Sequence, residues 1–261
     1  MEHILSLSYG KDSLACLGAI EKLGWTLDRI IHADVWATDT IPADLPPMME
    51  FKDKADKIIK DRYGIDVEHI RSVYTFQDTF YKVCGESGRA CKSKCKGKIY
   101  GWPFQRGPWC NSRLKQHVLD KLPKRAVQYV GIAIDEPGRF HILSENKKSP
   151  LVEAEWDEAY CREWCKENDL LSPIYTTATR GGCWFCHNQG VGQLRLLRKN
   201  YPEYWALMLK WDKDSPVTFH ADGHTVHDFE RRFCMEDDGF ILPDERFRWS
   251  MLDEELNVRL F

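Results

Sequence analysis

The six residues SYGKDS, which follow the first apolar run of the chain, carry side chains suited to binding a phosphate group. Gly10 lets the main chain approach an anion closely, and Lys11 adds a positive charge. Ser8 and Ser13 supply hydroxyl groups, and Asp12 stands where a carboxylate would cap a helix. The same residues would also serve to cap a helix without any ligand, so this pattern leaves both interpretations open.

The turn lies between a predicted strand and a predicted helix. Ile4–Leu7 is an apolar run of strand length. After the turn, apolar residues recur at helical spacing, at Leu14, Leu17, Ile20 and Leu23. A strand that enters a helix through a tight turn points main-chain N–H groups and the positive end of the helix dipole at an anion.

Three further strands are predicted, over Arg29–Trp36, Ile65–Val73 and Ala126–Ile134, and a helix is predicted over Met49–Tyr63. Strands separated by helices predict an α/β fold with a doubly wound parallel sheet. Ligands of such sheets bind at the carboxyl ends of the strands. Asp34 stands at one of these ends, where it either contacts a nucleotide or metal or caps the following turn.

Ten cysteines in a chain without a recognisable signal peptide favour metal or redox chemistry over a disulfide framework. Cys183 and Cys186 form a Cys-x-x-Cys pair after two glycines, a spacing that lets both sulfurs converge on one metal. Cys110 precedes a predicted amphipathic helix over Leu114–Leu122, whose first turn favours a thiolate. An iron–sulfur cluster, a structural zinc ion and a redox-active dithiol are all compatible with the pair.

Three other groups of metal-ligating residue types are weaker signals. A zinc knot with a fourth ligand could form on Cys84, Cys91 and Cys95, but their spacing favours thiols without a metal. Cys161 and Cys165 lie on one face of a helix predicted over Glu155–Asn168 and are expected to be buried. A metal could bind His220, His224 and His227 with nearby aspartates, but their glycine-containing surroundings favour a surface turn.

SYGKDS resembles the pyrophosphatase loop (PP-loop, SGGxDS) of the adenine-nucleotide alpha-hydrolase superfamily. Its SxGKDS form is that of the sulfonucleotide (PAPS) reductase family and of Dnd-type sulfur-insertion proteins. The stretch GPWCNSRLK resembles the cysteine, arginine and lysine element of those reductases, although Trp109 replaces their first cysteine. Ser149–Val152 resembles their Asn-Pro-Leu turn, and Gly182–Cys186 resembles their Gly-Cys-x-x-Cys element.

The resemblance implies a HUP-like fold of the PP-loop type that binds ATP or a related adenine nucleotide with Mg²⁺. It implies a [4Fe-4S] cluster on Cys110, Cys183 and Cys186, with the fourth iron open or bound by His187, Cys165 or a substrate atom. The residues implied for nucleotide binding are Ser8, Tyr9, Gly10, Lys11, Asp12, Ser13, Asp34, Arg113 and Lys115. Those implied for catalysis are Lys11, Asp12, Asp135, Glu136 and Arg139.

Two departures from the reductase pattern bear on function. Ala133 takes the place of an arginine that grips phosphate or sulfate, and the Glu-Cys-Gly-Ile/Leu-His element with the nucleophilic cysteine is missing. We therefore expect an enzyme that cleaves ATP between its α- and β-phosphates to adenylate a substrate. Sulfur transfer through the cysteine centre would follow, as in nucleic-acid thiolation. A PAPS or APS reductase and a nucleotide-sensing subunit without turnover are the alternatives.

Composition and charge bear on partners and location. No run approaches the roughly 18 apolar residues of a membrane span, so a cytoplasmic protein without membrane contact is expected. The block Arg89–Arg125 is basic, with Asp120 as its only acid, and either contacts nucleic-acid phosphates or is a solvated surface. A cysteine desulfurase or another sulfur donor is an expected partner. We expect a PP-loop domain over 1–190, with an insertion at 74–108, and a helical extension over 191–261.

Overall fold

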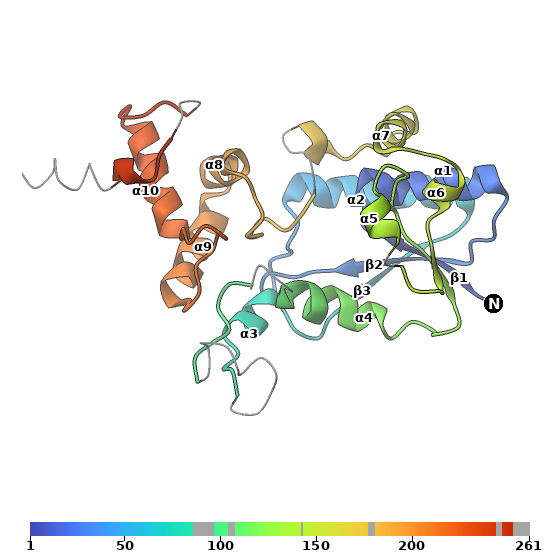
Figure 1. Ribbon diagram of the computed structural model, residues 1–261, viewed down its shortest axis with the longest axis horizontal. Coiled ribbons are helices and arrows are strands. Elements are labelled where there is room, and N and C mark those ends of the chain that lie inside the picture. The colour runs from blue at the N-terminus through green and yellow to red at the C-terminus, as the bar shows by residue number, and fades with distance from the viewer. Residues whose placement is uncertain (86–96, 104–107, 142, 177–180, 244–246, 253–261) are drawn as a thin grey trace, which may run out of the picture. The chain divides into compact units, whose positions relative to one another are not determined.

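The computed structural model of the chain describes residues 1–85, 97–103, 108–141, 143–176, 181–243 and 247–252 (Figure 1). The chain divides into two compact units. The first comprises Met1–Thr79 and Gly107–Trp184, and the second comprises Phe80–Arg106 and Phe185–Phe261. Most of the expected insertion therefore belongs with the C-terminal helices. None of the described helices is long and apolar enough to cross a membrane.

The first unit is built on a five-stranded sheet in which all strands are parallel. This confirms the expected parallel α/β fold. The spatial order is β3-β2-β1-β4-β5, so the chain moves outward from β1 on one side and then returns to the other side of β1. The strands are β1 (His3–Leu7), β2 (Arg29–Asp34), β3 (Val67–Arg71), β4 (Val127–Tyr129) and β5 (Lys147–Lys148).

The first two long helices of this unit follow the predicted pattern. Helix α1 (Lys11–Leu23) ends at Gly24, whose φ of 64° favours glycine. Helix α2 (Pro46–Tyr63) begins before the expected Met49 because proline is compatible with the first turn of a helix. The remaining helical segments are α3 (Phe76–Phe80), the π-helix η2 (Asn111–Gln116), α4 (His117–Leu119), α5 (Pro137–Phe140), α6 (Pro150–Glu153), α7 (Glu158–Glu167) and the 3₁₀ segment η3 (Pro173–Thr176).

Alternate residues of the central strands face opposite sides of the sheet. Leu5 and Ile30 join the large apolar core formed with α1, α2, α6 and α7. Ile4 and Ile31 instead pack with Leu119 at the end of α4. Helices therefore cover both faces of the sheet, as Figure 1 shows for α1 and α4.

Strand β4 is shorter than the predicted Ala126–Ile134 because its continuation turns away from the sheet. The N–H of Ala133 donates to the carboxylate of Glu136, and the N–H of Ile134 donates to the carbonyl of Trp156. A Cβ atom on Gly131 would lie 2.6 Å from the main-chain nitrogen of Ser13. Glycine is therefore required where this stretch passes the first turn of α1.

The second unit contains α8 (Val191–Asn200), α9 (Pro202–Asp214) and α10 (Val226–Asp237) within its described residues. Buried Asp212 on α9 accepts hydrogen bonds from Nε1 of Trp102 (2.9 Å) and from Nδ1 of His227 (2.6 Å). This carboxylate links three separate segments of the unit. Thr225 and Asp228 form a reciprocal cap at the start of α10, so the expected surface turn around the histidines runs into a helix.

Candidate functional site

The turn between β1 and α1 is closed by the side chain of Ser13. Its Oγ accepts hydrogen bonds from the N–H (3.1 Å) and the hydroxyl (2.9 Å) of Ser8. It donates in turn to the carbonyl of Gly10 (3.0 Å). One hydroxyl therefore makes three hydrogen bonds across the turn and fixes the shape of its main chain at the carboxyl end of β1.

Tyr9 stands where the PP-loop pattern has glycine, and its φ of 55° lies in the region that glycine favours. For a residue with a side chain this conformation costs about 1–2 kcal/mol. The Tyr9 side chain is buried, its hydroxyl donates to Asp56 of α2, and its ring lies edge-on to His32 with centroids 4.7 Å apart. These contacts offset the conformational cost and anchor the turn to α2 and β2.

The ammonium group of Lys11 is held by two carboxylates at the start of α1. Its Nζ lies 2.8 Å from Oδ1 of Asp12 and 2.8 Å from Oε2 of Glu158 on α7. Burial alone would lower the pKa of Lys11, but these hydrogen bonds outweigh burial and raise that pKa. Gly10 occupies the N-cap of α1 without a side-chain cap, so the expected capping role of Asp12 is wrong. The Asp12 carboxylate pairs with Lys11 instead.

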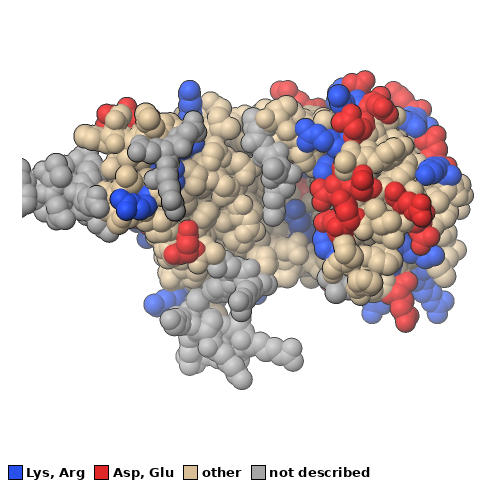
Figure 2. Space-filling model, turned by 45° about the horizontal axis from the view of Figure 1, so that its top comes forward, with Lys and Arg blue, Asp and Glu red and all other residues tan. Residues whose placement is uncertain are grey.

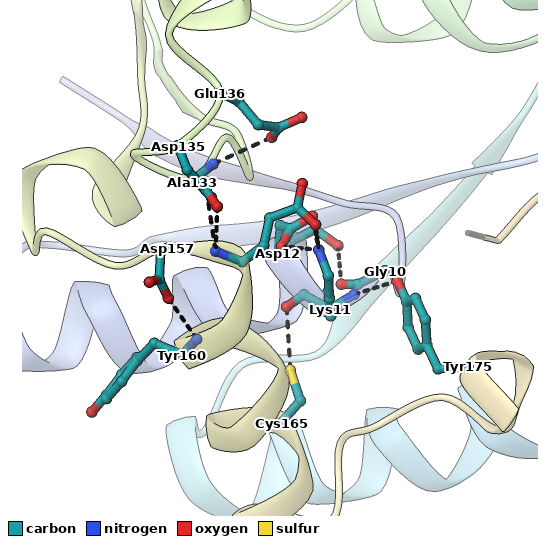
Figure 3. Close-up of polar contacts among 12 residues, drawn as sticks. Gly10, Lys11, Asp12, Ala133, Asp135, Glu136, Asp157, Tyr160, Cys165 and Tyr175 are labelled. Atoms are coloured by element: carbon teal, nitrogen blue, oxygen red, sulfur yellow. Dashed lines mark hydrogen bonds and ion pairs between the residues drawn. The ribbon is translucent and has the colours of Figure 1, made fainter. Parts of the chain in front are cut away.

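The other expected catalytic residues, Asp135, Glu136 and Arg139, follow β4, and Figure 3 shows the first two together with Lys11. Asp135 accepts a hydrogen bond from the N–H of Glu158 (3.2 Å), at the start of α7. Glu136 pairs with the exposed Arg139 (2.6 Å). Acidic side chains gather on the face of the first unit that carries α5, α6 and α7 (Figure 2). Nothing in the sequence marks Glu158, because α7 meets α1 only in the folded chain.

A cavity of about 300 Å³ opens beside the carboxyl ends of β1 and β2. Its walls include the turn Ser8–Gly10, the end of β2, Tyr175 of η3 and Cys183. Lys52 and Lys115 add positive charge to this wall. Of the expected nucleotide-binding residues, those that line the cavity are Ser8, Tyr9, Gly10 and Lys115. Lys11, Asp12, Ser13, Asp34 and Arg113 are not among its lining residues.

Buried Lys52 on α2 joins this cavity to a second hollow of about 270 Å³, since it lines both. Its Nζ lies 2.8 Å from Nε2 of His32 and 2.6 Å from Oδ2 of Asp44. Asp34 pairs with Lys52 at 3.4 Å and with Nδ1 of His69 at 2.9 Å. His32 and Asp34 lie two residues apart on one strand and so share a face, which is a signal that the sequence carries. No pattern in the sequence marks Lys52 as a neighbour of these two residues.

Burial and hydrogen bonding act in opposite directions on Asp34. Burial alone would raise its pKa, but hydrogen bonds to His32 and His69 and the charge of Lys52 outweigh burial and lower that pKa. Burial lowers the pKa of His32, although its hydrogen bond with Asp34 acts in the opposite direction. In the structure Asp34 is therefore an ionised partner of these side chains.

The three expected metal ligands are all half-buried. Cys110 immediately precedes η2, and Cys183 lines the cavity. The boundary between the two units falls between Cys183 and Cys186, so the convergence of this pair on one metal stays a prediction. Among the residues that the structure describes, no three His, Cys, Asp or Glu side chains form a group that could hold a metal ion.

The other cysteine predictions concern two groups, one on helix α7 and one in the expected insertion. Cys161 and Cys165 are fully buried, as expected, and the Cys165 thiol donates to the carbonyl of Lys11 (3.2 Å). Burial raises the pKa of the Cys165 thiol to about 12, so this residue is a neutral packing group. Cys84 is also buried. Cys91 and Cys95 lie outside the described residues.

No protein-family model matches the chain, and no curated protein matches it in sequence.

The ion pairs of His69 generate a prediction about pH. Its Nδ1 faces Asp34 and its Nε2 lies 3.0 Å from Oδ2 of Asp56. Burial alone would lower the pKa of His69, but these carboxylates outweigh burial and raise that pKa above its ordinary value. The pairs therefore stabilise the fold below about pH 6.5, and this contribution is lost as the pH rises through the raised value. We expect Asp56→Asn to lower the pKa of His69, measured by NMR titration of its Cε1 proton.

Asp53→Asn is the matched control because Asp53 lies one helical turn away on α2 and forms no ion pair with His69 among the described residues. It should leave the His69 titration close to that of the wild type. Equal pKa values of His69 in the wild type and in Asp56→Asn would contradict the role assigned to Asp56.

Proposed function

We propose that the first unit binds an adenine nucleotide and cleaves its α–β phosphoanhydride to adenylate a substrate that then receives sulfur. The observation that carries this proposal is the cavity whose wall contains both the Ser8–Gly10 turn and Cys183. A turn at the start of a long helix favours binding of a phosphate, and the Cys183 thiol in the same wall would lie close to a nucleotide bound there. The parallel sheet supports the proposal because ligands of such sheets bind at the carboxyl ends of strands.

The proposed reaction follows from these side chains. An oxygen of the acceptor attacks the α-phosphorus, the bond from that phosphorus to the bridging oxygen breaks, and pyrophosphate leaves with the electron pair. The nucleotide enters as its magnesium complex. Main-chain N–H groups of the turn, with Lys52 and Lys115, stabilise the charge that develops on the phosphates. The adenylated oxygen is then a good leaving group, which sulfur displaces.

The proposed function includes a metal centre bound by cysteine thiols. Cys110, Cys183 and Cys186 would hold a [4Fe-4S] cluster, and their thiols are the donor type that such clusters use. The neighbouring indoles of Trp109 and Trp184 are buried and would shield the site from water. When bound, the cluster would supply a site that carries sulfur. Zinc and a redox-active dithiol are the competing interpretations.

Pyrophosphate formation tests the adenylation step. We expect the wild-type protein to release pyrophosphate from ATP when acceptor is present, and to release AMP only when a sulfur donor is present as well. Ser13→Ala, which removes the hydroxyl that closes the turn, should lower the rate by at least about tenfold. Ser144→Ala is the control, because among the described residues the Ser144 hydroxyl hydrogen-bonds to Asn146 alone, in an exposed loop. ATP binding without release of pyrophosphate would contradict adenylation and indicate a nucleotide-sensing subunit. Release of adenosine phosphates from PAPS or APS with formation of sulfite would indicate a reductase.

Metal analysis tests the cysteine centre. Protein purified without oxygen should contain close to stoichiometric amounts of iron and acid-labile sulfide for one cluster, with a broad visible absorption. Cys183→Ala should lose both, whereas Cys234→Ala, on the exposed side of α10, should retain them. Stoichiometric zinc, or no metal in either protein, would exclude the cluster.

A nucleic acid is the proposed acceptor, and the charges around α4 support it. Lys115, Lys121, Lys124 and Arg125 are exposed, and none of them forms an ion pair with the described part of the chain. Two lysines of α2 differ from these basic residues, because Lys54 forms an ion pair with Asp169 and Lys60 forms one with Asp66. Lys115 also lines the cavity, so this basic surface begins at the proposed site.

Charge reversal tests this surface. Changing Lys121, Lys124 and Arg125 together to Glu should weaken binding of RNA or DNA and reduce the slope of log affinity against log salt by roughly 2 to 3. The same change at Lys54, Lys57 and Lys60 on α2 is the matched control and should leave that slope close to the wild-type value. Equal slopes for the two triple variants would contradict a nucleic-acid surface at α4.

A further inference from the structure

The side chain that reaches the first N–H group of α1 comes from a distant part of the sequence. The Tyr175 hydroxyl accepts a hydrogen bond from the main-chain N–H of Lys11 at 3.0 Å (Figure 3). It also lies directly over the turn, since a Cβ atom on Gly10 would be 3.5 Å from the Tyr175 oxygen. Tyr175 and Gly10 both line the 300 Å³ cavity.

The hydrogen of this hydroxyl is available to a ligand. Within the described residues, the Tyr175 O–H donates to no acceptor, while its oxygen already accepts from Lys11. A hydroxyl can donate one hydrogen bond while it accepts another, so the described part of the chain leaves the donor capacity of Tyr175 unused. Burial raises the pKa of Tyr175, and the phenol therefore keeps its hydrogen at neutral pH.

The surroundings of the hydroxyl make it a good donor. The N–H group of Lys11 belongs to the positive end of the α1 dipole, and a hydroxyl that accepts from such a group is polarised and donates more strongly. The guanidinium group of Arg162 lies over the ring, 5.8 Å from its centroid. Tyr175 thus extends the donor at the start of α1 outward by about 3 Å, the length of one hydrogen bond.

We propose that Tyr175 is a phosphate-binding residue whose hydroxyl accepts from the Lys11 N–H and donates to a non-bridging phosphate oxygen of the nucleotide. The proposal rests on the nucleotide site proposed above and adds to it a residue that no local motif indicates. No bond forms or breaks at Tyr175, so the residue contributes binding and orientation of the phosphate rather than proton transfer. Adenosine, which has no phosphate, would not use this contact.

The test compares ATP with adenosine by isothermal titration calorimetry on the full chain. Tyr175→Phe keeps the ring and removes only the hydroxyl. We expect this variant to bind ATP about tenfold more weakly, the effect of losing one hydrogen bond to a charged group, and to bind adenosine as the wild type does. Tyr160→Phe is the control, because Tyr160 is half-exposed on α7 and does not line the cavity. It should leave both affinities unchanged.

Three other results of this titration would contradict either the role of Tyr175 or the nucleotide site itself. Unchanged or tighter ATP binding by Tyr175→Phe would overturn the proposal, and tighter binding would mean that phosphate displaces the hydroxyl from the Lys11 N–H. An equal loss of ATP and adenosine affinity would assign Tyr175 a structural role only. A wild-type protein that binds neither ATP nor inorganic pyrophosphate would overturn the nucleotide site itself, and this proposal with it.

Discussion

Closure of the turn between β1 and α1 is the constraint on which the site depends. The hydroxyl of Ser13 joins both ends of this turn through Ser8 and Gly10, and the cavity wall is built on the resulting main-chain shape. Hydrogen bonds of this kind contribute only about 1 kcal/mol each to stability. In the proposed site their larger effect would be to hold the donors of the turn in place before a ligand binds, so that binding would not have to order them.

Tyr9 connects this local closure to the rest of the first unit. A tyrosine at positive φ is unfavourable by itself, so the contacts of its side chain with Asp56 and His32 must hold it there. Those residues belong to the network around Lys52, which lines both cavities. The main chain of the turn and the charged wall at the end of β2 are therefore parts of one packed arrangement.

Intramolecular partners satisfy the groups of the turn that would bind phosphate in the proposed site. The charge of Lys11 is paired with Asp12 and Glu158, and its N–H is paired with Tyr175. Buried cations and main-chain donors need such partners because leaving them unpaired is costly. A phosphate bound at the proposed site would compete with, or add to, contacts that the protein already makes, and the donor capacity that Tyr175 has left among the described residues favours addition.

The sequence by itself determined the parallel α/β fold, the strand–turn–helix at SYGKDS and the burial of Cys161 and Cys165, because periodicity and turn composition are local properties. Only the tertiary structure decided which groups meet at the turn. Glu158 and Tyr175 reach Lys11 across 147 and 164 residues of chain, and no local pattern specifies contacts at such separations. The shortening of β4 has the same origin, since the N–H of Ile134 takes a partner from the distant Trp156 instead of the sheet.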